Sequence, residues 1–196
     1  MRAYRDRPRG WVRSDLVQPG PSPLAGTGLF ASTSIPSGTV LGAYPGRPRS
    51  WEEMKEKESR APGCKQYVFT TGVDDPTVLA TLRHSLRLLE SFPAIPPGSG
   101  HIGGGIYLDP TSDCGTLPSP FPSPGTWWPF PVAVELAYAN EPAPGSVRGG
   151  PNCTVEDGDQ ADAELLFVVA RDIAAGEEIL IDYGQHYDRS GYQQGF

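Results

Sequence analysis

Short runs of apolar, β-branched and aromatic residues alternate with turns along most of this chain. Six runs have the length and composition of strands: 28–32, 39–44, 66–71, 105–109, 164–170 and 178–183. The run 164–170 is almost continuously apolar, which is typical of a buried strand, whereas 178–183 alternates. Turn residues, such as those of Ile35–Gly38, separate the runs. The pattern therefore predicts a β-rich fold of several short sheets.

Two segments have the pattern of helices instead. Residues 51–59 follow Ser50, and Glu53 stands three residues after it, which is the arrangement of a capping box. Residues 76–91 follow Asp75 and carry a proline at the first helical position. Leucines recur on one face of this second segment: Leu79, Leu82, Leu86 and Leu89. We expect that face to be a packing surface, in an α+β fold dominated by strands.

Glycine and proline together make up 46 of the 196 residues, and ten prolines and seven glycines fall within 93–131. This density excludes a helical bundle and predicts that 93–131 is mostly loop. The length of the chain fits one domain with a substantial core. No apolar run approaches the roughly 20 residues that span a bilayer, so we expect no membrane partner.

The charge is distributed unevenly. Residues 1–13 hold five Arg and one Asp and predict a basic N-terminal arm, while the rest of the chain has a net charge of −11. Such an acidic body disfavours direct nucleic-acid binding and favours a cationic ligand or partner. Nine acidic residues and a single basic one, Arg171, lie within 154–182. This stretch is either a solvated face or an approach surface for a basic substrate, and both interpretations stay open.

Three cysteines, Cys64, Cys114 and Cys153, are separated by 50 and 39 residues and form no C-x-x-C pair. An odd, widely spaced set excludes a disulfide framework, and the three histidines show no metal-ligand spacing. We therefore expect no metal site and a reducing, intracellular compartment. Nucleus and cytoplasm both fit this expectation, and an organelle is not excluded.

The segment Gly26–Ala31 reads G-T-G-L-F-A and matches the G-x-G-x-x-A fingerprint of dinucleotide-binding loops. That fingerprint needs an apolar strand before it and a helix after it. Here Pro19–Pro23 precedes it and Pro36 interrupts the segment after it, so the dinucleotide interpretation fails on context. The glycines still fit either a plain turn or a backbone that approaches a ligand closely.

Several blocks, taken in order, are more specific than any one of them. The glycine loop 22–31 is followed by I-P-S-G-T-V-L-G-A-Y-P-G at 35–46, by Asn140 with Pro151-Asn152-Cys153, and by G-E-E-I-L-I-D-Y-G at 176–184. This ordered set resembles the SET domain family of protein lysine methyltransferases. The resemblance implies a SET-like fold with a threaded C-terminal segment, spanning 14–190 after the arm 1–13. Residues 72–131 would then be an insertion into a single domain.

The resemblance also implies roles for individual residues. The cofactor S-adenosylmethionine (AdoMet) would be bound by the glycine loop and by residues further along: Gly26, Thr27, Gly28, Leu29, Tyr67, Asn140, Glu141 and Tyr183. Tyr183 matches the tyrosine whose hydroxyl lies beside the methyl group, and Tyr44 matches a second tyrosine of the lysine channel. These two tyrosines are the expected catalytic residues. The channel for the substrate lysine would be lined by Tyr44, Ile181 and Tyr187.

The chain also departs from the family pattern. Glu141 stands where the family has histidine, and a glycine-rich insert separates Asn140 from 151–153, so a weaker cofactor site is one expectation. No cysteine follows Cys153, so we expect no zinc-binding post-SET cluster. Ile181 occupies a position where an aromatic residue often sets the number of methyl groups, which leaves the product state open.

These residue types fit methyl transfer to an amine. In-line displacement needs a neutral lysine amine, close alignment and a channel without water. Tyrosine hydroxyls hold an amine without giving it a charged partner. The prediction is an AdoMet-dependent protein lysine N-methyltransferase that acts on a basic protein or peptide, a histone tail being the family's commonest substrate. The alternative, suggested by Glu141 and the interrupted asparagine block, is a non-catalytic SET-like protein-binding module. The oligomeric state stays open.

Overall fold

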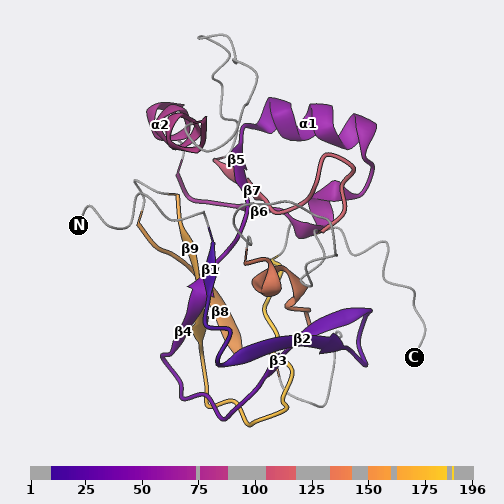
Figure 1. The fold of residues 1–196 in the computed structure, drawn as a ribbon, viewed down its shortest axis with the longest axis vertical. Coiled ribbons are helices and arrows are strands. Elements are labelled where there is room, and N and C mark those ends of the chain that lie inside the picture. Colours follow the sequence, from indigo (N-terminus) through magenta and orange to yellow (C-terminus); the bar gives the residue numbers. More distant parts are fainter. Residues whose placement is uncertain are drawn as a thin grey trace.

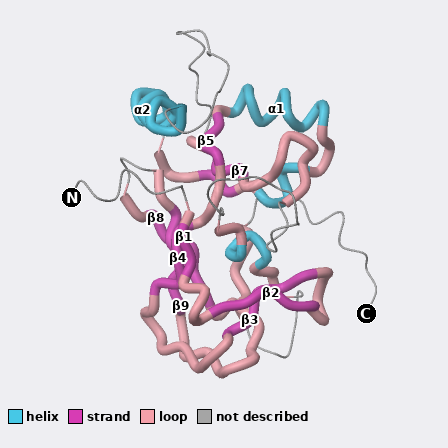
Figure 2. The backbone as a smooth tube through the Cα atoms, in the orientation of Figure 1, coloured by secondary structure: helices cyan, strands magenta, loops and turns pink. Residues whose placement is uncertain are grey.

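The computed structural model describes residues 10–73, 76–87, 105–117, 133–142, 150–159, 163–184 and 187. This part of the chain holds three small antiparallel sheets, two α-helices and two short 3₁₀ helices. The helices α1 (Trp51–Arg60) and α2 (Pro76–Arg87) lie at one end, and the hairpin of β2 (Val17–Pro21) and β3 (Thr27–Ala31) lies at the other (Figure 1). Figure 2 shows how much of the chain between the short strands is loop. The predicted β-rich fold of short sheets is confirmed.

The largest sheet has the order β1-β4-β9-β8, formed by Trp11–Val12, Val40–Ala43, Leu165–Val169 and Cys153–Asp157. The strand predicted over 164–170 is observed as β9, and burial alternates along it. Leu165, Phe167 and Val169 are buried, whereas the residues between them are partly exposed. One face of β9 therefore packs into the core, as in other antiparallel sheets that are covered on one side.

The strand β1 corrects the expected extent of the basic arm. Trp11 and Val12 pair with Ala43 and Gly42 of β4, so the folded chain begins before residue 14. A side chain on Gly42 would collide with the Trp11 carbonyl, and glycine is therefore required where the two strands approach so closely. The sequence does not indicate this two-residue strand, because the strand is defined only by its pairing with a distant segment.

The sheet β5-β7-β6 lies under the helical end and is formed by Arg47–Arg49, Tyr107–Asp109 and Phe69–Thr70 (Figure 1). The strand predicted over 66–71 is shorter than expected, because Cys64–Tyr67 form the 3₁₀ helix η1 and only Phe69 and Thr70 pair with β7. Helix α1 begins with the predicted capping box. Ser50 Oγ accepts from Glu53 N, and Ser50 N donates to the Glu53 carboxylate at 2.7 Å.

Helix α2 confirms the predicted helix as far as Arg87, and residues 88–91 lie outside the described residues. Leu79 and Leu82 are buried against Ile106 and Ala163, so this part of the leucine face is a packing surface. Asp75 and the side chains of Leu86 and Leu89 lie outside the described residues, and of the predicted loop 93–131 only 105–117 is described. Neither described helix is long and apolar enough to cross a membrane.

The closing segment 178–183 is threaded between two other parts of the chain. It is not the strand that its sequence predicts, because it makes only isolated bridges, Phe30 with Glu178 and Asn140 with Leu180. On one side Ile181 N donates to Asn140 O at 3.0 Å. On the other side Leu180 O accepts from the backbone N–H groups of 152 and 153, each at 3.0 Å. The predicted threaded C-terminal segment is thereby confirmed.

Candidate active site

The glycine loop meets Asn140, which lies more than 110 residues further along the chain. Asn140 follows the 3₁₀ helix η2 (Glu135–Tyr138), and this short helix packs against β2 and β3. Its side-chain nitrogen Nδ2 donates to Ala25 O at 3.3 Å and to Thr27 O at 3.4 Å. The same nitrogen donates to Glu178 Oε1 at 2.9 Å. The structure thus brings together three segments that the sequence assigns to one site.

The two halves of the glycine loop differ in exposure. Gly26 and Thr27 are exposed, and no atom lies within 4 Å of the place that a Cβ on Gly26 would take. Gly28 and Leu29 are buried, and a Cβ on Gly28 would collide with the carboxylate of Glu178. The loop is therefore anchored at 28–29 and presents open backbone at 26–27.

Residues 139–141 hold Tyr183 at two points. The Tyr183 hydroxyl donates to Ala139 O at 2.9 Å, and the Tyr183 backbone N–H donates to Glu141 Oε1 at 3.1 Å. Glu141, which stands where the family has histidine, therefore has a structural role: its carboxylate fixes the backbone of Tyr183, the candidate catalytic tyrosine. No sequence signal links the Glu141 side chain to residue 183.

Tyr44, the second candidate catalytic residue, lies at the end of β4 and is only 3% exposed. Its ring stacks on Phe167 with 5.7 Å between ring centroids and meets Phe69 edge-on at 4.7 Å. Its hydroxyl donates to Tyr67 O at 2.6 Å. Tyr44 is thus held by its ring and by its hydroxyl, and Tyr67 contributes its backbone carbonyl to that contact.

Four tyrosines predicted for the site are electrostatic neighbours. Burial raises the pKa of Tyr44 well above its usual value, and the neighbouring Tyr183, Asp109, Tyr67 and Tyr187 raise it further. The Tyr183 and Tyr187 rings lie 4.5 Å apart between centroids. Ile181 is 1% exposed and belongs to the same core cluster as Tyr44. Tyr44 therefore stays a neutral phenol at physiological pH.

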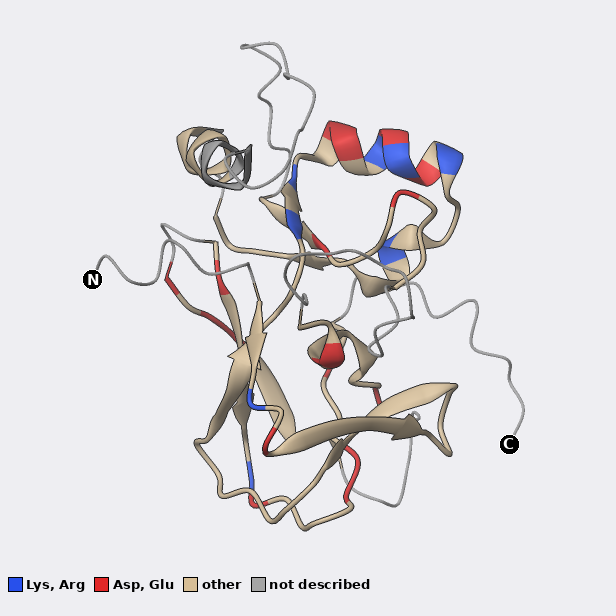
Figure 3. Ribbon diagram, in the orientation of Figure 1, with Lys and Arg blue, Asp and Glu red and all other residues tan. Residues whose placement is uncertain are grey.

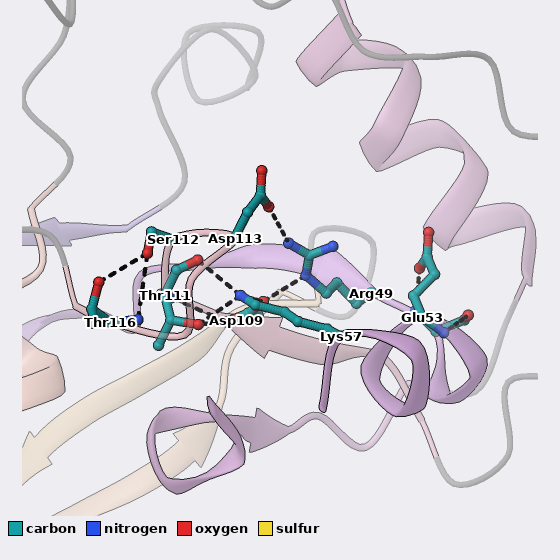
Figure 4. A network of polar contacts seen from close by, with 9 residues as sticks. Arg49, Glu53, Lys57, Asp109, Thr111, Ser112, Asp113 and Thr116 are labelled. Atoms are coloured by element: carbon teal, nitrogen blue, oxygen red, sulfur yellow. Dashed lines mark hydrogen bonds and ion pairs between the residues drawn. The ribbon is translucent and has the colours of Figure 1, made fainter. Parts of the chain in front are cut away.

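A second polar cluster lies between α1, β5 and β7, and its Asp109 is also an electrostatic neighbour of Tyr44 (Figure 4). Lys57 Nζ donates to Asp109 Oδ2 at 2.6 Å and to the hydroxyl and carbonyl of Thr111 at 2.6 and 3.1 Å. Arg49 Nε donates to the same Asp109 oxygen, and Thr111 Oγ1 donates to Asp109 Oδ1 at 2.6 Å. Burial alone would raise the pKa of Asp109, but these hydrogen bonds and the two cations lower it. All charges of the cluster are paired.

Two residues that hold the site together were not predicted for it. Glu178 contacts both Asn140 and the glycine loop, and Asn152, which is completely buried, holds the closing segment. Asn152 Oδ1 accepts from Leu180 N and Asn152 Nδ2 donates to Glu178 O, both at 2.8 Å. Both residues lie inside motif blocks that the sequence singles out, but their partners are set by threading, which sequence spacing does not reveal.

Within the described ranges, no three His, Cys, Asp or Glu side chains gather in a way that would hold a metal ion. The geometry defines a small threaded β domain whose polar junction joins a glycine loop, an asparagine and a pair of tyrosines. The family model of the SET domain matches residues 26–184. The chain therefore belongs to the SET domain family.

A solved structure agrees with this fold. The Neurospora SET domain protein DIM-5, a histone lysine methyltransferase, has a TM-score of 0.53 and 17% sequence identity over 88% of this chain. The chain spans 53% of the length of that DIM-5 structure. The methyltransferase domain of human PR domain-containing protein 2 gives a TM-score of 0.47 at 16% identity, over 88% of this chain and 80% of that one. No curated protein sequence matches the chain at a significant level.

Proposed function

We propose that this chain is an AdoMet-dependent protein lysine N-methyltransferase. The observation that carries the proposal is the direction of two hydrogen bonds. The hydroxyl protons of Tyr44 and Tyr183 are both donated to backbone carbonyls, those of Tyr67 and Ala139. A hydroxyl that has donated its proton can only accept from a further group.

Acceptors are what a nucleophilic lysine amine needs around it. The N–H groups of a neutral amine donate to acceptors, while its lone pair must stay free to attack the methyl carbon. A hydroxyl that donated its proton to the nitrogen would occupy that lone pair. A charged acceptor would favour the protonated, unreactive amine. Tyr44 is kept neutral by burial, so it is an uncharged acceptor for the amine.

The residues of the polar junction suit AdoMet, which carries an ammonium, a carboxylate and a sulfonium. Open backbone at Gly26 and Thr27 allows a ligand to approach the loop, and Asn140 would hold its amino-acid end. Glu178 is a half-buried carboxylate that no Lys or Arg of the described residues neutralises, which suits a cationic ligand. When bound, AdoMet supplies an electrophilic methyl group.

The substrate proposed here is a basic protein segment such as a histone tail. The support is charge: β8 and the loop after β9 carry exposed acids, including Glu156, Asp157 and Asp172, and Figure 3 shows red segments among the tan ones in this part of the ribbon. Helix α1 carries both signs instead, with acids in its first turn and bases in its last. A basic peptide would be attracted to the acidic side.

Two measurements test the proposal. Calorimetry with AdoMet should show binding to the purified chain, and radiolabelled methyl groups should pass to lysines of histones or of a proteome extract. Binding without transfer to any lysine-containing substrate would contradict the enzymatic proposal and favour a protein-binding module. Absence of AdoMet binding at millimolar concentration would also remove the cofactor assignment.

A further inference from the structure

The carboxamide of Asn140 is held in one orientation. Its nitrogen Nδ2 faces three oxygens, those of Ala25, Thr27 and Glu178, at 3.3, 3.4 and 2.9 Å. Reversing the amide would bring its oxygen against these three acceptors, so the surroundings fix which atom is which. The oxygen Oδ1 makes no hydrogen bond to any described residue, and it is the end of the amide that remains as an acceptor.

Glu178 makes the shortest of the three contacts and is itself firmly placed. Its backbone bridges to Phe30 of β3, and its carbonyl accepts from Asn152 Nδ2 at 2.8 Å. Its carboxylate lies against Gly28, at a place where any larger residue would collide with it. The position of the carboxylate is therefore set by the core and the threaded segment, and Asn140 adjusts to it.

We propose that Glu178 is a positioning residue for cofactor binding: by accepting from Asn140 Nδ2, it turns Asn140 Oδ1 into an acceptor for the ammonium group of AdoMet. This inference rests on the function proposed above. An ammonium has three donors and no acceptor, so only the oxygen end of the carboxamide can hold it. Without Glu178 only the two longer contacts, to the carbonyls of Ala25 and Thr27, would orient the carboxamide, and part of the affinity would be lost in ordering it.

The test compares two substitutions of one residue by calorimetric titration with AdoMet. Glu178→Ala removes the acceptor and should weaken AdoMet binding about tenfold, which corresponds to about 1.4 kcal/mol. Glu178→Gln keeps an acceptor oxygen and should stay within about threefold of the wild type. Equal losses in both variants would show that charge rather than orientation matters, and no loss in either would also overturn the inference.

A double-mutant cycle separates positioning from general damage. Once Asn140→Ala has removed the carboxamide, adding Glu178→Ala should cost no further affinity, because nothing remains to be positioned. Additive losses would overturn the inference. Glu177→Ala is the matched control: its carboxylate pairs with Arg171 at 2.6 Å and touches Asn152, so it should lower stability while AdoMet affinity stays within a few-fold.

Reversing the polarity of the contact covers the case in which Glu178→Ala does not fold. Asn140→Asp places two carboxylates face to face and should reduce AdoMet affinity at least tenfold. Adding Glu178→Gln supplies an amide donor and should restore most of that loss, whereas no restoration would contradict the inference. If the wild-type chain itself binds no AdoMet, the proposed function fails; if it binds but these variants bind equally well, only the role of Glu178 fails.

Discussion

Two polar clusters of this chain use similar side chains but differ in how their charges are balanced. Around Asp109, Lys57 and Arg49 supply cations, and the Lys57 and Asp109 side chains are 3% exposed or less. Around Asn140, a half-buried carboxylate receives an amide hydrogen bond and has no cationic partner among the described residues. The ions of the first cluster are thus paired within the protein, whereas the carboxylate of the second has no cationic partner among the described residues.

This difference indicates a division of labour between the two ends of the domain. A buried charge network costs stability unless every member is paired, and its usual role is to fix one arrangement of the chain. Lys57, Asp109 and Thr111 join α1 to β7 and the loop after it in this way. The carboxylate of Glu178 instead orients Asn140 beside the open backbone of 26–27, which suits a role in ligand binding. The helical end is therefore expected to carry stability, and the threaded end to carry binding and chemistry.

The largest effect is expected from breaking the paired cluster. Asp109→Asn leaves Lys57 and Arg49 without their shared anion, and removing one partner of a buried pair destabilises by about 3–5 kcal/mol. Urea unfolding followed by circular dichroism measures this loss. Combining it with Lys57→Met, which removes the stranded cation, should recover part of the stability. If Asp109→Asn alone is as stable as the wild type, the distinction between the two clusters is wrong.

The same carboxylate predicts a pH dependence. The pKa of Asp109 is lower in the folded chain than in the unfolded one, because its hydrogen bonds and cations outweigh the cost of burial. Its contribution to stability is therefore complete above the unfolded value, about 3.9, and is lost as the pH falls through the lower folded value. Unfolding free energies measured between pH 6 and about 2 should fall less steeply for Asp109→Asn than for the wild type.

The next largest effect is expected on the rate of methyl transfer and not on the fold. Tyr183→Phe keeps the ring beside Tyr187 but removes the acceptor oxygen proposed to hold the lysine amine. Methyl transfer should fall about 10²-fold, which corresponds to roughly 2.7 kcal/mol, while AdoMet binding changes little. The lost hydrogen bond to Ala139 O should cost about 1 kcal/mol of stability. Single-turnover transfer of labelled methyl measures the rate, and calorimetric titration measures AdoMet binding.

Asp182→Asn provides the control for Tyr183→Phe. Asp182 is exposed, and its side-chain oxygen accepts from Gly184 N at 2.7 Å, a contact that asparagine can retain. The change removes one charge beside Tyr183 without touching the hydroxyl, so transfer should stay within a few-fold. Full activity in a folded Tyr183→Phe variant would place the reaction elsewhere, and unfolding of that variant would show a purely structural role for the hydroxyl.

The sequence predicts best those features that depend on neighbouring residues. The capping box of Ser50 and Glu53 depends on residues three apart in the sequence, and it is observed. The leucine face of α2 depends only on burial, and it is observed for its described leucines, Leu79 and Leu82. Ordered motif blocks also identify the residues that meet at the threaded junction. These predictions succeed because helix caps and helical faces are local features.

Features that depend on distant partners escape such reasoning. The strand β1 exists because Gly42 lets Trp11 approach, and residues 178–183 form bridges instead of a strand because they are threaded between two segments. Lys57 and Asp109 are 52 residues apart, and nothing in their spacing indicates a pair. One local hint did exist, since Lys57 follows the buried Met54 by one helical turn, where a charged residue needs a partner.

The smallest expected effect concerns the start of α1, at the edge of the paired cluster. Ser50→Ala removes the oxygen that accepts from Glu53 N, and loss of such a cap costs about 1 kcal/mol. Ser50 N keeps its bond to the Glu53 carboxylate, so Glu53→Ala added to Ser50→Ala should lower the stability further. Urea unfolding measures both steps. If α1 contributes to stability alone, the folded Ser50→Ala variant will bind AdoMet as tightly as the wild type. A loss of affinity comparable to that of Glu178→Ala would instead show that the two ends of the domain are coupled.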